Sequence, residues 1–515
     1  MKIININKTA FIALLALIVG ACNSDYLDTY PTDETSPTTV FENTKNVEMA
    51  VNGLAKIMVS QHLVTQGFSG EGTIKMYYGE YSGNNFRVNL PGWSPMINGQ
   101  YFDNITSIYN YYPWHYYYMI ITNANVIIDQ VDEVEGPDKD KKYLKAQALA
   151  YRAYSYTMLA QLYGYRWDDS NNGMQPCLIL RTSPDDAVSL PLSPLKDIYA
   201  AIYTDLDQAL LLFDDSKYVR GANHQIDGSV AHAIYARAAL ARKDYTTAAD
   251  QAGLARTKYR LMTNSEYLAG FANPNAEWIW SSYGASDEQL YFYSYQAMIA
   301  YNSSASAVRL YPKRMSKELY EQIPDTDLRK GLFLNPSGFD GQFVASTGLV
   351  TAGSDLDKAT RANFPDLQSN AAVAAYMQFK IKANDMPGVG HLNHFRSAEM
   401  LLIEAEAKFF SGDQGTAATL LEELNRQSGR DPNYSCSLSG DLLFKELVKY
   451  RGIELWGEGF DWFDMKRWNL SIDRKKVVDG GNYPDLLAVK IEANADHKWT
   501  WKTPSKETDF NETLD

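Results

Sequence analysis

The sequence is poor in cysteine and in positive charge, and each shortage excludes a class of protein. Its three cysteines are Cys22, Cys177 and Cys436. They are too few for a disulfide framework in 515 residues, so the fold must depend on a packed core, whether or not Cys177 and Cys436 pair. The 62 acidic residues outnumber the 48 Lys and Arg residues. We expect no nucleic-acid partner, because a chain with a net charge of −14 offers no basic face to neutralise phosphates.

Apolar runs of membrane-spanning length are also missing after the first 22 residues. Residues 1–21 join a basic start to an apolar run and to Val-Gly-Ala, which is typical of a secretory signal peptide and too short for a mature membrane-spanning helix. Cys22 follows directly, as in a bacterial lipobox; an ordinary signal peptide with a chance cysteine is the alternative. We expect lipid on Cys22 to anchor the chain to a membrane. Residues 22–40, rich in Asp, Thr, Ser and Pro, should form an extended spacer.

Motifs of the common enzyme classes are absent as well. The sequence has no nucleophile elbow, Walker loop, zinc motif or dinucleotide fingerprint. Asp168, Ser170, Asn172 and Gly173 are spaced like the start of an EF-hand calcium loop, but Ile179 stands where that loop needs its Glu. We therefore expect no metal and no other cofactor, with a structural calcium in this loop as the alternative.

Helical periodicity dominates the rest. Apolar residues recur at helical spacing along "KKYLKAQALAYRAYSYTMLAQLYG", and Gly164 stands where that helix should end. Another helix is predicted with Ser193 as its N-cap and Pro194 in its first turn. "AIYARAALARKDYTTAADQAGLA" aligns with "LIEAEAKFFSGDQGTAATLLEEL" when Asp244 is set on Asp413, and four alanines then match. Unless the match is chance, these small residues let two antiparallel helices approach closely, as in tetratricopeptide pairs.

The segment between these two helical pairs differs in character. Residues 264–390 are rich in Tyr and Ser without clean periodicity, and they contain the strand-like run "EWIWSSYGAS". Such long irregular segments are usually functional or disordered, and the aromatic content argues against disorder. We predict one body at residues 41–515, with a helical scaffold at 41–263 and 391–515 and an irregular insertion at 264–390.

The densest aromatic run, "YNYYPWHYYY" at residues 109–118, is either a stacking wall or the inside of a helix. Pro113 divides it, and a helical stripe starts at Trp114. We interpret most of the run as scaffold and expect Tyr111 and Tyr112, before the proline, to contact solvent.

Two acidic clusters raise the question of catalysis, because glycosidases use a pair of carboxylates. In "YRGIELWGEGFDWFDMKRW", residues 450–468, acids alternate with basic and aromatic residues. Glu399, Glu404 and Glu406 lie in an alanine-rich helix. Both patterns favour ion pairs that brace helices over a catalytic site.

Irregular segments are better places for a ligand. Aromatic faces stack on sugar rings, and neighbouring amides and charged groups fix the hydroxyls. The loop "GEYSGNNFRVNLPGW" and the segment "EWIWSSYGASDEQLYFYSY" combine such residues, although buried aromatics are the commoner case. The candidate ligand-binding residues are Asn84, Asn85, Arg87, Trp93, Trp280, Tyr283, Tyr291, Tyr293 and Tyr295.

Six motifs, in order along the chain, resemble those of the SusD/RagB family, the nutrient-binding lipoproteins of Bacteroidota outer membranes. They are "CNSDYLDTYPTDET", "VFENTKNVEMAVNGLAKIM", "KAQALAYRAYSYTMLAQLYG", "HFRSAEMLLIEAEAKFFSGD", "YRGIELWGEGFDWFDMKRW" and the tail "WKTPSKETDFNETLD". The resemblance implies a mostly α-helical, SusD-like body of tetratricopeptide-like pairs with a large irregular, loop-rich ligand-binding region.

The resemblance also implies a function and a partner. Family members typically bind glycans and lie as hinged lids over a SusC-like TonB-dependent transporter, while a minority that resembles RagB handles peptides. We expect a non-catalytic, lipid-anchored protein at the surface of the outer membrane. It should capture oligosaccharide or polysaccharide and deliver it to such a transporter, with peptide capture as the alternative. The sequence does not identify the glycan.

Overall fold

The computed structural model covers most of the body of the chain. It describes residues 40–63, 67–88, 93–284, 292–493 and 499–514. The expected signal peptide, Cys22, most of the expected spacer and Tyr291 lie outside the described residues. Within the described ranges, the helices fall short of the length and apolar character that a membrane crossing would require.

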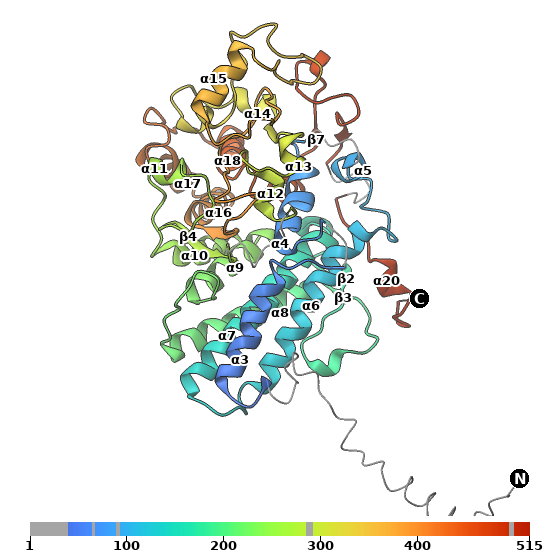
Figure 1. Cartoon of the computed structure of the whole chain (residues 1–515). Coiled ribbons are helices and arrows are strands. Elements are labelled where there is room, and N and C mark those ends of the chain that lie inside the picture. Colours follow the sequence, from blue (N-terminus) through green and yellow to red (C-terminus); the bar gives the residue numbers. More distant parts are fainter. Residues whose placement is uncertain (1–39, 64–66, 89–92, 285–291, 494–498, 515) are drawn as a thin grey trace, which may run out of the picture.

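Long helices form the body of the protein, as the periodicity predicts. Neighbours in the chain pack against one another, and α3, α6, α7 and α8 run side by side in the lower half of Figure 1. Most side chains of α7 are buried, so this helix lies at the centre of the group. The long helices are α3 (Thr44–Ile57), α6 (Ile108–Gln130), α7 (Asp138–Tyr163), α8 (Leu195–Ser216), α9 (Gly228–Ala241), α10 (Tyr245–Arg256), α16 (Ser397–Phe410), α17 (Gln414–Glu422) and α18 (Gly440–Glu454).

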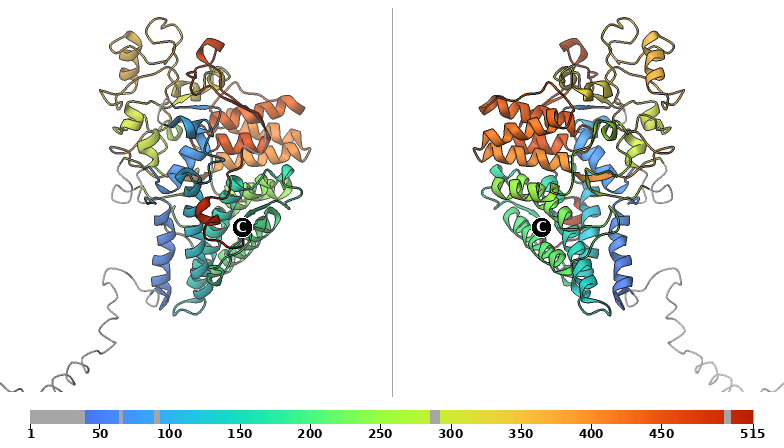
Figure 2. Two further views of the ribbon diagram at one scale, coloured as in Figure 1. Left: turned by 90° about the vertical axis from the view of Figure 1, so that its right-hand side faces the viewer. Right: turned by 90° about the vertical axis from the view of Figure 1, so that its left-hand side faces the viewer.

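The two aligned segments form the predicted helical pairs, α9–α10 and α16–α17. In each pair an aspartate caps the second helix: Asp244 accepts a hydrogen bond from the backbone N–H of Thr247, and Asp413 from that of Thr416. Most of the matched alanines are buried, and α10 packs directly against α16. The two pairs, far apart in the sequence, are therefore neighbours in space, stacked in both views of Figure 2.

Helix α6 begins earlier than predicted, at Ile108, and contains Pro113. A proline lacks the N–H that would bond the carbonyl four residues before it. The Tyr78 hydroxyl donates to that carbonyl instead, at 2.6 Å. The helix therefore continues through the proline, and Tyr112 is fully buried rather than exposed, while Tyr111 is half-buried. Most of the aromatic run is scaffold, as predicted.

Two other helix boundaries test the sequence signals. α7 ends at Tyr163 with Gly164 as its C-cap, as predicted. α8 begins at Leu195, and its N-cap is Pro194 rather than Ser193. The predicted cap is displaced because Ser193 and Pro194 form a short strand.

The strands are short, and each forms an antiparallel pair. The pairs β1–β5 and β4–β6 join segments that are far apart in the sequence. The pairs are β1 (Phe86–Arg87) with β5 (Arg314–Met315), β2 (Pro176–Leu178) with β3 (Ser193–Pro194), β4 (Trp278–Ser281) with β6 (Asn393–Arg396), and β7 (Ile472–Asp473) with β8 (Lys490–Ile491).

Between residues 264 and 390 the described elements are short, and α14 and α15 lie in the upper part of Figure 1. The helices of this segment are α11 (Asn264–Tyr267), α12 (Tyr295–Ile299), α13 (Ser306–Arg309), α14 (Lys317–Glu321), the 3₁₀ turn Leu328–Leu332 and α15 (Asp355–Asn363). Short helices elsewhere are α4 (Gly70–Thr73), α5 (Ser94–Ile97), α19 (Asp461–Trp468), α20 (Ser505–Thr508), the π-helical stretches Ile74–Tyr81 and Glu423–Gln427, and the 3₁₀ turns Trp167–Asp169, Pro184–Asp186 and Val477–Asp479.

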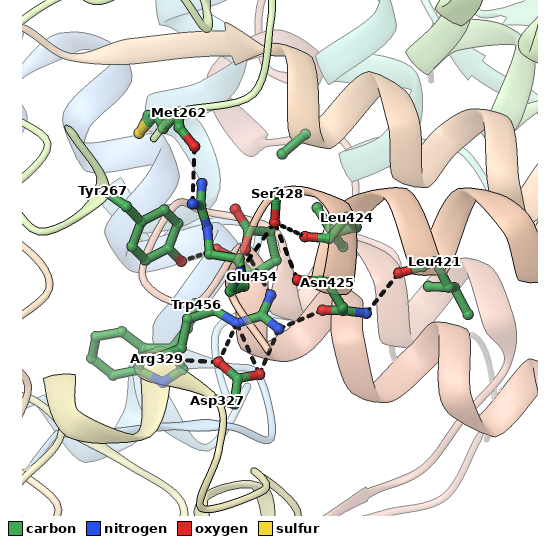
Figure 3. Close-up of polar contacts among 12 residues, drawn as sticks. Met262, Tyr267, Asp327, Arg329, Leu421, Leu424, Asn425, Ser428, Glu454 and Trp456 are labelled. Atoms are coloured by element: carbon green, nitrogen blue, oxygen red, sulfur yellow. Dashed lines mark hydrogen bonds and ion pairs between the residues drawn. The ribbon is translucent and has the colours of Figure 1, made fainter. Parts of the chain in front are cut away.

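A network of buried ion pairs ties the C-terminal segment to the rest of the core, and Figure 3 shows part of it. Arg329 contacts Asp327 at 2.6 Å and Glu454 at 2.8 Å. Arg396 contacts Glu454 at 2.7 Å and Glu458 at 2.8 Å. Burial alone would raise the pKa of Glu454, but the two guanidiniums hold that pKa well below its usual range. Glu454 is therefore a permanent anion of the core.

The acids of α16 are also paired, which confirms that both acidic clusters form ion pairs. Each of these carboxylates contacts an arginine of another element. The pairs are Glu399 with Arg237, Glu404 with Arg256, and Glu406 with Arg467.

Candidate functional site

Aromatic side chains from separate segments gather in what we call the aromatic patch. Its members are Phe68, Tyr77, Trp93, Tyr101, Tyr109 and Tyr293. The ring centroid of Trp93 lies 4.5 Å from that of Tyr77 and 5.8 Å from that of Tyr109. Tyr101 stacks on Tyr109 at 4.8 Å with an interplanar angle of 14°. Trp93, Tyr101, Tyr109 and Tyr293 are half-buried, so each keeps part of its ring in contact with solvent.

The backbone beneath the patch is irregular. Tyr77 lies in the π-helical stretch Ile74–Tyr81, a form of helix that is frequent at functional sites. Gly67 has a φ of +96°, and a Cβ there would lie 3.1 Å from the Tyr77 hydroxyl and 3.8 Å from the Tyr293 ring. A Cβ at position 67 would crowd the Tyr77 hydroxyl and touch the Tyr293 ring, so the glycine allows the backbone to lie close to both residues.

The buried tyrosines of the patch stay neutral. Burial, reinforced by neighbouring tyrosines, raises the pKa of Tyr77 well above its usual range, and burial also raises the pKa of Tyr109. Both hydroxyls therefore keep their protons at neutral pH and can donate as well as accept hydrogen bonds. Aromatic faces with neutral polar edges match the apolar faces and hydroxyls of a sugar.

Trp93 and Tyr293 are the predicted ligand residues that the structure brings together in the patch. The sequence analysis did not single out Tyr101, which stands in "INGQYFDN", a loop rich in Gly and Asn like the loop of Trp93. That composition was the signal that could have found it. Tyr109 is the first residue of the aromatic run. The run was expected to be mostly scaffold, but in the structure the ring of Tyr109 lies against that of Trp93.

The other described candidates from residues 277–295 belong to the core or its rim. Trp280 is 1% exposed, and its indole N–H donates to the His224 carbonyl at 3.1 Å. Tyr295 is 7% exposed, and its hydroxyl donates to the Gly457 carbonyl at 2.6 Å. Burial leaves neither ring a face for a ligand, which corrects the prediction for both. Tyr283 is half-buried, with its ring 4.0 Å from that of His224.

The polar candidates near β1 hold the fold together. The side-chain amide of Asn85 donates to Asp461 at 2.9 Å, and the side-chain oxygen of Asn84 accepts from the backbone N–H of Asp473 at 3.0 Å. Arg87 is 1% exposed, which corrects its prediction as a ligand residue of an open surface loop. Because β1 pairs with β5, the part of the predicted loop that contains Phe86 and Arg87 is attached to the core by a strand pairing.

A groove of about 530 Å³ between the turn Leu328–Leu332 and α15 is another place where a ligand could bind. Phe339 and Phe364 are half-buried in its wall, and Asn335 and Asn363 are exposed. Aromatic and amide groups thus share one wall here too. The sequence analysis did not identify this groove, because its walls come from two separate parts of the insertion.

The loop considered for calcium turns its carboxylates toward cations of the protein. Asp168 pairs with Lys243, and Asp169 pairs with Arg166 at 2.7 Å. In the described part of the chain, no group of three or more His, Cys, Asp or Glu residues is arranged to hold a metal ion. The absence of a metal stays the prediction and a calcium in this loop the alternative, and a metal titration can test both.

Comparison with known families identifies the protein class. A family model described as "Starch-binding associating with outer membrane" matches residues 25–240, and one described as "SusD family" matches residues 361–514. The chain belongs to the SusD/RagB family. Two relatives come from Formosa agariphila. SusD-like protein P2 is 24% identical over 496 residues, 90% of each chain, and SusD-like protein P38 is 22% identical over 447 residues, 79% of this chain and 82% of its own.

Solved structures of SusD-like proteins share this fold. A SusD-like carbohydrate binding protein from Bacteroides vulgatus has a TM-score of 0.75 at 24% identity, over 92% of this chain and 98% of its own. A SusD superfamily protein from Bacteroides thetaiotaomicron has a TM-score of 0.72 at 22% identity, over the same shares. A laminarin binding SusD-like protein has a TM-score of 0.61 at 16% identity, over 91% and 98%. These likenesses confirm the predicted mostly α-helical, SusD-like fold.

Proposed function

We propose that this SusD/RagB-family protein captures oligosaccharide at the surface of the outer membrane and delivers it, uncleaved, to a SusC-like TonB-dependent transporter. Lipid on Cys22 would hold it there. The observation that carries the proposal is the aromatic patch. Half-buried Trp93, Tyr101 and Tyr109 meet there, joined by half-buried Tyr293 from a segment far away in the sequence.

The physical character of the patch suits a carrier that must release its ligand. Each aromatic contact contributes on the order of 1 kcal/mol beyond the area it buries. A few such contacts with modest hydrogen bonding give a total of about −4 to −8 kcal/mol, which corresponds to millimolar to micromolar affinity. A ligand held this weakly dissociates readily and can pass to a transporter.

Two further observations support the proposal. The matching family model is described by starch binding and association with the outer membrane, and similar structures are described as carbohydrate binding and laminarin binding. Most carboxylates of the two acidic clusters, such as Glu399, Glu454 and Glu458, are engaged in ion pairs of the core, and Asp461 accepts hydrogen bonds from Asn85. This engagement favours binding over hydrolysis.

Calorimetric titration of the chain that starts after Cys22, against purified oligosaccharides and a mixed peptide pool, tests the proposal. We expect heat with at least one glycan. Trp93→Ala should weaken that binding about tenfold, roughly 1.4 kcal/mol, because it removes the central ring of the patch. Phe410→Ala is the matched control, since Phe410 is a 42% exposed aromatic residue that stacks on Tyr245 in the helical pairs.

Other outcomes would change the proposal in defined ways. Glycan binding that survives both Trp93→Ala and Tyr293→Ala would keep the ligand class and move the site, with the groove beside α15 as the next place to examine. Heat with peptides and none with glycans would replace glycan capture by peptide capture. Release of reducing sugar by the purified protein would contradict a non-catalytic role.

A further inference from the structure

Two arginines lie side by side in the interior without a carboxylate partner. Arg87 of β1 and Arg314 of β5 occupy opposite strands of one ladder and are 1% and 0% exposed. In the described part of the chain, neither forms an ion pair. Burial lowers the pKa of Arg87 to about 10, and burial together with the charge of Arg87 lowers the pKa of Arg314 well below its usual value.

The hydrogen bonds of this pair are incomplete. Arg87 Nη2 and Arg314 Nη1 both donate to the Thr347 carbonyl, at 3.2 and 2.7 Å. Three further nitrogens are buried without a partner in the described structure: Arg87 Nε, Arg314 Nε and Arg314 Nη2. One carbonyl dipole does not balance two cations, and a buried charge without a counter-ion is strongly unfavourable.

The neighbouring buried side chains Lys313 and Arg474 are themselves cations, so they do not provide the negative charge that the arginine pair lacks. Lys313 donates to the carbonyls of Ala307 and Tyr311. Arg474 donates to the carbonyls of Gly83 and Tyr81, and its Nη1 has no partner in the described structure. Four buried cations therefore gather around β1 and β5. The carboxylate of Asp461 acts on Arg474, whereas in the described structure no carboxylate is among the charges that shift the pKa of Arg87 or Arg314.

A surface turn covers the pair. Thr347, whose carbonyl both arginines contact, ends the turn 344–347, in which Val344 is 51% exposed. Gly348 follows with a φ of +71°, and a Cβ there would lie 2.4 Å from Arg314 Nη1 and 3.4 Å from Arg87 Nη1. Glycine thus lets a segment that solvent reaches lie directly against both guanidiniums.

We propose that Arg87 and Arg314 hold a small oxyanion, of the sulfate or carboxylate type, beneath the turn 344–347. A planar guanidinium presents its N–H groups in pairs that match the oxygens of such an anion. The anion would accept from the unpartnered nitrogens and balance the two charges. This site is separate from the aromatic patch and does not depend on glycan binding there.

Thermal unfolding of the full chain in sodium sulfate, against sodium chloride at equal ionic strength, tests the proposal. We expect sulfate to raise the Tm of the wild type by roughly 2 °C and to saturate. Arg314→Met should melt at or above the wild-type Tm without sulfate, because it removes an unbalanced charge, and should not respond to sulfate. Arg260→Met, which alters a half-exposed arginine paired with Glu266, should respond as the wild type does.

A different pattern would overturn the site. Sulfate also stabilises proteins by exclusion from their surface, and a rise that does not saturate and is equal in Arg314→Met would be that effect alone. A marked loss of Tm in Arg314→Met without any response to sulfate in the wild type would also reject the proposal. Sodium glucuronate separates the sources: a rise at lower concentration than with sulfate points to the acidic group of a sugar, and a response to sulfate alone points to a free anion.

Diffraction provides a test that needs no variant. Wild-type crystals soaked in selenate should show an anomalous selenium peak beside Arg87 Nε and Arg314 Nε, with selenate oxygens at hydrogen-bond distance from both nitrogens. A carboxylate of the chain itself or an ordered water in that position, with no peak, would overturn the proposal.

Discussion

Two groups of buried arginines in this protein have the same exposure and opposite surroundings. Arg329 and Arg396 are 1% exposed, and each contacts at least two carboxylates, as Figure 3 shows for Arg329. Arg87 and Arg314 are 1% and 0% exposed, and they share the Thr347 carbonyl. Burial alone therefore does not separate a structural arginine from one that is placed to bind a ligand.

The paired and the unpaired arginines should differ in how a substitution changes the stability of the protein. Where the charges are paired, removal of one partner leaves the other buried and uncompensated, and stability falls. Where the charge has no partner, its removal relieves a cost that the folded state already carries. The first arrangement stabilises the scaffold, and the second points to a partner from outside the chain.

The largest expected effect is on the paired side. Glu454→Gln keeps the shape of the side chain but removes the anion that Arg329 and Arg396 share, and it should lower the free energy of unfolding by about 3–5 kcal/mol. Denaturant unfolding measures this value. Asp325→Asn is the control, since this exposed acid also contacts a cation, Lys330, and its loss should leave stability nearly unchanged. A loss below about 1 kcal/mol for Glu454→Gln would mean that the network is not what holds this region.

Both regions should gain stability as the pH rises, but over different pH ranges. On the paired side, burial opposes but Arg396 outweighs it, and the pKa of Glu458 is lowered, so its stabilisation is full above the unfolded pKa and is lost as the pH falls below it. On the unpaired side, burial lowers the pKa of Lys313 from 10.5 to about 7. Between these values the unfolded chain binds more protons than the folded chain, so stability rises with pH.

Lys313→Met isolates the contribution of this lysine. Between pH 7 and 9 the wild type should gain about 2 kcal/mol more than the variant in free energy of unfolding. Burial also lowers the pKa of Lys466 to about 7, but that lysine is present in both proteins and cancels in the comparison. Parallel curves for the two proteins would show that Lys313 is neutralised in another way.

The parts of the structure that the sequence predicts depend on residues close together in the chain. The helical pairs follow from alanines and from aspartate caps within one turn of the helices that they start, and Gly164 ends α7 as expected. A structural role for the acids of residues 450–468 could be expected because they alternate with basic and aromatic residues, although partners such as Arg396 lie outside this stretch. In each case the signal lies within about one or two helical turns.

The parts that it does not predict depend on distant partners. Trp280 is buried because β4 pairs with β6, more than a hundred residues later. Helix α6 continues through Pro113 because Tyr78 bonds the freed carbonyl. Arg87 was interpreted as a ligand residue of an open loop, and only the pairing of β1 with β5 shows that it meets Arg314 in the interior. Exposure is set by such contacts, so the sequence could name aromatic candidates but not their accessible faces.

The smallest expected effect comes from comparing two glycines, of which only Gly348 lies against the unpaired arginines. Gly348 and Gly353 have φ values of +71° and +76°, so alanine is strained at both by about 1–2 kcal/mol. A Cβ at 348 would meet Arg314 Nη1 at 2.4 Å, whereas a Cβ at 353 has no atom within 4 Å. Gly348→Ala should therefore lose about 1 kcal/mol more free energy of unfolding than Gly353→Ala and should also lose the sulfate response in thermal unfolding.

The backbone strain is shared by the two variants and cancels in this difference, which leaves only the contact with the guanidiniums. Equal losses, with sulfate still effective in Gly348→Ala, would mean that Arg314 moves aside freely and that the two arginines do not form a preorganised site.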